Sequence, residues 1–169
     1  MDGLLRVGDS CKAGYKDLIR KIRNSRRVHV DETGMKVNDE KWWLWLFITD
    51  KGDVLTVIRK SRGKDVPREI LGEYKGVVIA DGWRAYNGFI LQRCWAHLLR
   101  EVDDFRKSII GKRLSSDIHL KFKELKDLLD KDLSTEEREL IKTRLDRGME
   151  ELVKKHEGCK EIKKNHNLY

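Results

Sequence analysis

Short apolar runs separated by polar loops dominate the first half of the chain, and they predict strands. The runs cover 28–33, 41–50, 54–59, 77–80 and 89–94, and they are rich in β-branched or aromatic residues. Short polar connections join the first three, which indicates an antiparallel meander. The connection 34–40 is predicted as a polar turn, and 50–53 as a hairpin turn in which Gly52 supplies a positive φ.

Apolar residues at helical spacing predict helices between and after these strands. The predicted helices include about 13–24, 66–71 and 95–105, and two more follow in the C-terminal part. The last helix opens with Ser134 and Glu137 at the spacing of a capping box. A helix between 54–59 and 77–80 favours a crossover that places 77–80 parallel to 28–33.

This order of elements predicts an α/β fold. Its core is a mixed sheet of five strands, an antiparallel meander plus parallel strands, with an appended helical hairpin. We expect a basic helical lead-in over 1–27, the core over 28–110, a helical insertion over 111–160 and a polar tail over 161–169. A chain of 169 residues is long enough for one domain with such an appendage.

Composition narrows the expected partner and compartment. The chain has 37 Lys and Arg against 29 Asp and Glu, a formal charge of +8, which favours a polyanionic partner such as nucleic acid. No apolar run reaches the roughly 18 residues of a membrane helix. Three cysteines without a CxxC pair fit a reducing compartment, and no signal peptide begins the chain, so we expect a cytoplasmic protein without a membrane partner.

Two of the predicted strands run into an acid that is soon followed by glycine. Asp31 stands in the first strand and Asp81 directly follows the fourth, so parallel pairing would make them neighbours. Two close carboxylates repel, and a hard divalent cation such as Mg²⁺ or Mn²⁺ relieves the repulsion. Two such ions can clamp the oxygens of a phosphodiester displacement. The alternative is that Asp81 only forms a turn and caps the next helix.

Four motifs in series resemble the catalytic domain of DDE transposases of the insertion-sequence-66 type. They are Asp31-Glu32-Thr33-Gly34, Trp43-Leu44-Trp45, Ala80-Asp81-Gly82-Trp83-Arg84-Ala85-Tyr86 and Cys94-Trp95-Ala96-His97-Leu98-Leu99-Arg100. The resemblance implies an RNase H-like fold, with Asp31 and Asp81 as the first two metal-binding, catalytic carboxylates. It also implies DNA transposition, with Mg²⁺ or Mn²⁺ as the cofactor, two ions if the site is completed, and a homo-oligomer when active.

The third carboxylate of that family has no counterpart in this chain. In the family it is a Glu in an Asn-Asn-x-x-Glu-Arg setting after a helical insertion, and no such stretch occurs here. We therefore expect the hairpin over 115–157 to be the insertion, the chain to end before the triad closes, and the N-terminal DNA-binding region to be absent. Glu101 is the local substitute, or else it pairs with a surface cation. Glu32 points to the face opposite Asp31, which argues against it.

Cations near the two acids are candidates for DNA contacts. Arg59, Lys60, Arg62 and Lys64 gather in the loop after the third strand, and Arg84 lies near Asp81. Such cations would follow the phosphate backbone, or the loop is simply solvated. Trp83 and Tyr86 either stack on a base or fill the space between sheet and helix.

Two functions from different classes remain open. The first is metal-dependent cleavage and strand transfer by a transposase catalytic domain that is incomplete in this chain. The second is a non-catalytic DNA-binding remnant or regulator derived from a transposase. A host nuclease that acts on RNA or hybrids fits the motifs less well. The sequence leaves open whether the chain by itself is an enzyme.

Overall fold

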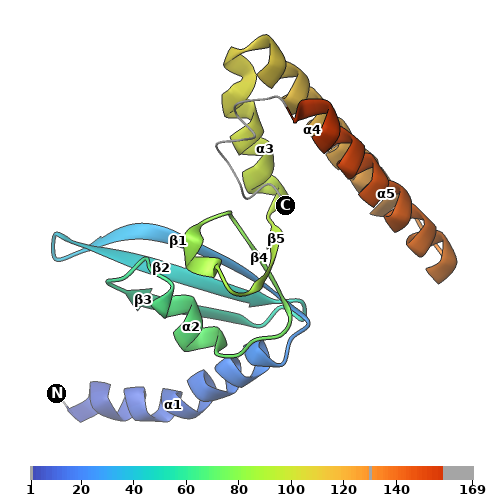
Figure 1. Cartoon of the computed structure of the whole chain (residues 1–169). Helices are drawn as coiled ribbons and strands as arrows, with labels where there is room; N and C mark the ends of the chain where they lie inside the picture. The colour runs from blue at the N-terminus through green and yellow to red at the C-terminus, as the bar shows by residue number, and fades with distance from the viewer. Residues whose placement is uncertain (1, 130, 158–169) are drawn as a thin grey trace. The chain divides into compact units, whose positions relative to one another are not determined.

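The computed structural model describes residues 2–129 and 131–157 (Figure 1). The chain divides into two compact units, and the boundary in the sequence falls between Cys94 and Trp95. The predicted tail over 161–169 lies outside the described residues. The predicted boundaries at 27, 110 and 160 are not decided by this division and stay predictions. In the part of the chain that is described, no helix has the length and apolar character to span a bilayer.

The first unit is built on a mixed sheet of five strands in the order β3-β2-β1-β4-β5. The strands are β1 (Arg27–Val37), β2 (Glu40–Thr49), β3 (Val54–Arg59), β4 (Val77–Ala80) and β5 (Ile90–Arg93). The first three pair antiparallel, whereas β4 is parallel to both β1 and β5. This is the predicted RNase H-like arrangement, and the α/β fold class is confirmed.

The first hairpin is longer than the sequence pattern indicated. The prediction of a turn over 34–40 is wrong, because β1 continues to Val37 and only Asn38 and Asp39 form the turn, with φ of 50° and 62°. Asn and Asp tolerate this left-handed region better than other non-glycine residues. Gly34 lies inside the strand, and a Cβ there would come within 3.7 Å of the Trp43 ring. The glycine that resembled a turn signal is therefore an ordinary strand position, since 3.7 Å is a normal van der Waals distance.

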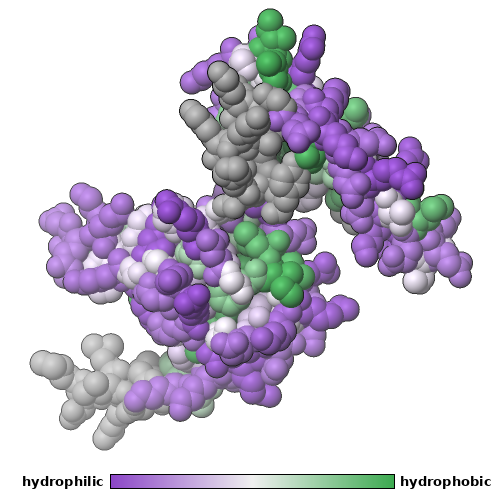
Figure 2. Space-filling model, in the orientation of Figure 1, coloured by the Kyte–Doolittle hydropathy of each residue, from purple (hydrophilic) through white to green (hydrophobic). Residues whose placement is uncertain are grey.

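Two α-helices and a short 3₁₀ helix pack on one face of the sheet. They are α1 (Asp2–Arg23), α2 (Asp65–Leu71) and η1 (Arg84–Tyr86). Alternate residues of the strands, among them Val28, Val30, Trp45 and Phe47, form one buried cluster with Ile22, Ile70, Tyr86 and their neighbours. Hydrophilic side chains make up most of the visible surface, and apolar ones gather in small patches (Figure 2).

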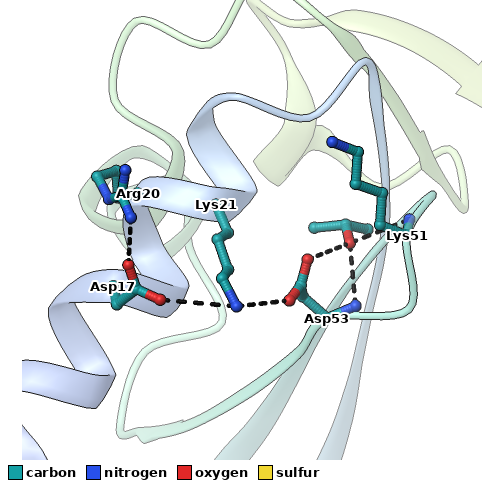
Figure 3. A network of polar contacts seen from close by, with 6 residues as sticks. Asp17, Arg20, Lys21, Lys51 and Asp53 are labelled. Atoms are coloured by element: carbon teal, nitrogen blue, oxygen red, sulfur yellow. Dashed lines mark hydrogen bonds and ion pairs between the residues drawn. The ribbon is translucent and has the colours of Figure 1, made fainter.

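Cations of α1 are used to hold that helix against the sheet. Lys21 lies between Asp17 on its own helix, 3.6 Å away, and Asp53 in the β2–β3 turn, 3.2 Å away (Figure 3). Arg23 donates to the backbone oxygens of Glu69 and Ile70 at 2.9 and 2.8 Å. The basic segment that opens the chain is thus an integral part of the first unit.

The second unit consists of helices. They are α3 (Trp95–Asp104), the 3₁₀ turn η2 (Phe105–Lys107), α4 (Ile109–Leu129) and α5 (Thr135–His156). α4 begins earlier than the pattern from Leu114 onward indicated, whereas the Ser134–Glu137 capping box forms as predicted. Asp117 in the first half of α4 accepts hydrogen bonds from Lys155 and His156 at the end of α5, both at 2.7 Å, and Lys121 farther along α4 lies against Gly148, earlier in α5. The two helices are therefore antiparallel, as expected.

Candidate active site beside two parallel strands

Asp31 lies in β1, and Asp81 directly follows β4, the strand that pairs parallel with β1. These strands pair with a constant offset of fifty residues: Arg27 with Val77, Val28 with Val78 and His29 with Ile79. Continued by two residues, this register aligns Asp31 with Asp81, which directly follows the last residue of β4. The paired residues end at His29 and Ile79, and β4 ends at Ala80, so Asp81 lies just beyond the paired part of the two strands.

Each of the two acids accepts a hydrogen bond from a nearby backbone N–H. Oδ1 of Asp31 accepts from Glu32 at 3.0 Å, and Oδ1 of Asp81 accepts from Trp83 at 3.0 Å. The second contact is an Asx turn, so Asp81 also makes the turn that the alternative interpretation expected. Burial raises the pKa of the Tyr86 phenol, and the charges of Glu32, Asp81 and Asp31 raise it further.

The carboxylates of Asp31 and Asp81 are oxygen ligands of the kind that a hard divalent cation prefers. Asp31 is exposed and Asp81 is half-buried, so solvent reaches both. Mg²⁺ commonly takes one or two protein carboxylates and fills its remaining positions with water and substrate phosphate. Within residues 2–129 and 131–157, no group of three or more His, Cys, Asp and Glu side chains could hold a metal ion. Glu101 lies on α3 in the second unit, and its role as a third carboxylate stays a prediction.

Glu32 is the residue whose importance the sequence did not reveal. Its side chain points to the core face, as predicted, and is only 1% exposed. Oε1 accepts from Nε of Arg62 at 2.9 Å, and Oε2 accepts from the Tyr86 hydroxyl at 2.5 Å. Burial raises the pKa of Glu32, although both hydrogen bonds act in the opposite direction. One sequence feature did point to Glu32: it comes two residues after the buried Val30, so it shares the buried face of the strand, where a carboxylate needs a hydrogen-bonding partner.

Three of the five predicted DNA-contacting cations are paired with carboxylates. Arg59 makes a two-pronged contact with Glu69, at 3.1 and 2.6 Å. Lys60 lies 2.7 Å from Glu40, and Arg62 binds Glu32. Their charges are therefore largely balanced within the protein.

Lys64 and Arg84 differ from those three cations. Both are exposed, and neither makes an ion pair with any residue in the described ranges. A further cation, Arg93, was not predicted: a Cβ on Gly82 would lie 2.5 Å from its Nη1, so its guanidinium packs against the backbone next to Asp81. The exposed cations in this part of the chain thus include Lys64, in the loop after β3, and Arg84, three residues after Asp81, whereas Arg93 packs beside Gly82.

A comparison with protein families shows to which family the chain belongs. The family model described as Transposase IS66 family matches residues 2–168. The chain belongs to this transposase family. The match covers the sheet, the helices between its strands and the helical second unit, so both units are parts of the transposase sequence.

Other comparisons add little about this transposase-family chain. It matches no curated protein sequence. One similar solved structure is a cryo-electron microscopy structure of the simian T-cell lymphotropic virus intasome in complex with the PP2A regulatory subunit B56 gamma. The identity is 14%, the match covers 54% of this chain and 42% of that chain, and the TM-score is 0.36. A likeness at that TM-score carries no argument about function.

Proposed function

We propose that the chain supplies two catalytic, metal-binding carboxylates, Asp31 and Asp81, for cleavage and joining of DNA phosphodiester bonds during transposition. The observation that supports this best is the fifty-residue register between β1 and β4, because its continuation by two residues would align the two acids of the transposase-like motifs. Membership of the transposase family supplies the reaction class.

Asp31 and Asp81 would hold Mg²⁺ or Mn²⁺, as one ion, or as two if a further carboxylate completes the site. A bound ion supplies Lewis-acid chemistry, which polarises phosphodiester oxygens and activates the attacking water or 3′-hydroxyl. The chain's own contribution is to orient the two carboxylates and to balance phosphate charge with the exposed cations Lys64 and Arg84. DNA is the proposed partner, and the active form is proposed to be a homo-oligomer.

A nicking assay on supercoiled DNA tests the proposal with Asp31→Asn and Asp81→Asn in the presence of Mn²⁺. Both variants are expected to lose metal-dependent nicking. Asp39→Asn is the matched control, because it makes the same change in the exposed β1–β2 turn, where Asn also tolerates the positive φ. Equal nicking by wild type, Asp31→Asn and Asp81→Asn would show that these carboxylates do not carry the reaction.

A non-catalytic DNA-binding derivative of a transposase is the second candidate. The observation in its favour is that no third acid joins Asp31 and Asp81 in a metal-binding group among the described residues. In the same assay, DNA binding by the wild type without metal-dependent nicking would support this candidate over the first.

A further inference from the structure

The buried acid Glu32 is separated from metal chemistry by its own hydrogen bonds. Both of its carboxylate oxygens are engaged, one by Arg62 and the other by Tyr86, and its side chain is 1% exposed. An acid that is occupied in this way does not replace the missing third metal ligand. Its contacts instead determine where the side chain of Arg62 lies.

The guanidinium of Arg62 lies between two indole rings. Its Cζ is 4.6 Å from the ring centroid of Trp43 on β2 and 4.6 Å from that of Trp83, which follows β4. A planar guanidinium stacks on aromatic faces and uses its edge for hydrogen bonds, which lysine cannot do in the same way. Arg62 therefore joins the loop after β3 to the loop after β4.

Trp83 carries this connection to the proposed metal-binding acid. Its indole Nε1 donates to the backbone oxygen of Arg62 at 3.3 Å, and its backbone N–H donates to Oδ1 of Asp81 at 3.0 Å. The ring stacking and the indole hydrogen bond both fix Trp83 relative to Arg62. A continuous series of contacts thus runs from Glu32 through Arg62 and Trp83 to Asp81.

We infer that Glu32, Arg62 and Trp83 are positioning residues that set the orientation of the Asp81 carboxylate. The inference rests on the proposed function, because it concerns the same pair of acids. It assigns Arg62 a different task from the phosphate contact suggested by its place in a basic loop. Arg62 holds a neighbouring tryptophan, and Glu32 holds Arg62.

The test compares Arg62→Lys with the matched control Arg59→Lys. Both arginines lie in the same stretch and pair with a glutamate, but Arg59 binds Glu69 and takes no part in the contacts to Trp83. One readout is hydrogen exchange at the backbone amide and the indole N–H of Trp83. The second is the affinity for Mn²⁺ alone, measured on the full chain by paramagnetic relaxation, with thermal unfolding as a check on folding.

Arg62→Lys is expected to speed exchange at both Trp83 sites by about three- to tenfold, the range for loss of one net hydrogen bond, and to weaken Mn²⁺ binding by a similar factor. Arg59→Lys is expected to leave both readouts at wild-type values. Trp83→Phe provides a second variant in case Arg62→Lys does not fold. It keeps a ring for stacking, loses the indole donor, and is expected to speed exchange at the backbone amide of position 83.

The two proposals fail in different ways. Wild-type exchange at Trp83 in Arg62→Lys, or equal effects of Arg62→Lys and Arg59→Lys, would overturn the positioning role. Mn²⁺ binding that Asp31→Asn and Asp81→Asn leave unchanged would overturn the metal site. The exchange readout would still decide whether Arg62 orients Asp81, because it requires no metal.

Discussion

The hydroxyl of Tyr86 donates a 2.5 Å hydrogen bond to Oε2 of Glu32, 54 residues earlier in the chain. Tyr86 is fully buried, and its ring meets Trp45 edge to face, with centroids 6.3 Å apart. The contact joins η1, just after Asp81, to β1, just after Asp31. Local structure around the two proposed ligands therefore depends on a buried phenol and a buried carboxylate that do not themselves bind metal.

Tyr86→Phe is expected to lower the free energy of unfolding by about 1–3 kcal/mol, because it leaves a buried carboxylate oxygen without its donor. Urea unfolding of the full chain measures the change. Tyr74→Phe is the control: its hydroxyl donates to the backbone oxygen of Ser25 at 3.1 Å, and its loss is expected to cost about 0.5–1.5 kcal/mol. A smaller loss in Tyr86→Phe than in Tyr74→Phe would contradict this account of Glu32.

Lys64→Ala and Arg84→Ala are each expected to weaken DNA binding and to reduce the slope of log affinity against log salt by about 1, as for loss of one phosphate contact. Fluorescence anisotropy over a salt series measures both quantities. Lys51→Ala serves as the control, because Lys51 is also exposed but lies in the β2–β3 turn, which follows Thr49, the partner of Val28 at the start of β1. An unchanged slope in Lys64→Ala and Arg84→Ala would remove these cations from the DNA contact.

Acid is expected to destabilise the helical unit through Asp117. Burial acts to raise the pKa of Asp117, but hydrogen bonds from Lys155 and His156 outweigh it and hold the pKa below its ordinary value. A lowered carboxyl pKa contributes stability that is present above the unfolded-state value of about 3.9 and is lost as the pH falls further. Asp117→Asn should therefore be less stable than wild type at pH 7, by about 1–3 kcal/mol, with a gap that narrows below about pH 4.

Urea unfolding followed by helical circular dichroism at several pH values measures this gap. Asp127→Asn is the control, since Asp127 is an exposed acid on the same helix, α4. A gap between wild type and Asp117→Asn that stays constant down to pH 3 would contradict the assignment.

Gly82→Ala is expected to destabilise the first unit by about 1 kcal/mol or less, because the added Cβ would lie 2.5 Å from Nη1 and 2.7 Å from Cζ of Arg93, the end of a flexible side chain that can shift. Arg93→Ala removes these atoms, so the cost of Gly82→Ala should shrink in that background, as a double-mutant cycle can measure. Gly14→Ala is the control: nothing lies within 4 Å of its Cβ, and alanine in a helix should stabilise by about 1 kcal/mol. Additive effects of Gly82→Ala and Arg93→Ala would rule out the contact.

Local patterns were sufficient to predict the strands, their order of connection and the pairing of β1 with β4. The run Val77–Ala80 is buried along most of its length, and the crossover through α2 makes it parallel to β1, as the element order indicated. The capping box at Ser134 was equally readable, because both of its partners lie within one helical turn. Interactions of this kind can be predicted because the residues that form them are close together in the sequence.

Contacts between distant residues could not be predicted in the same way. Arg62 lies 30 residues from its partner Glu32, and the sequence around either residue does not indicate that the two form a pair. A glycine inside a strand also gave a misleading signal, because Gly34 lies within β1, which continues to Val37. The basic loop after β3 looked like a phosphate-binding patch, whereas Arg59, Lys60 and Arg62 each bind a carboxylate of the protein.

The β1–β4 register has a consequence for how this part of the sequence can change. Backbone hydrogen bonds decide which residues of neighbouring strands face each other, at a spacing of about 4.8 Å, whatever the length of chain between the strands. Insertions in the turn at 50–53 alter the sequence interval between Asp31 and Asp81 without changing the register of β1 and β4. Relatives are therefore free to differ in that interval, and the alignment of two strands, more than a fixed count of residues, is what selection has to preserve.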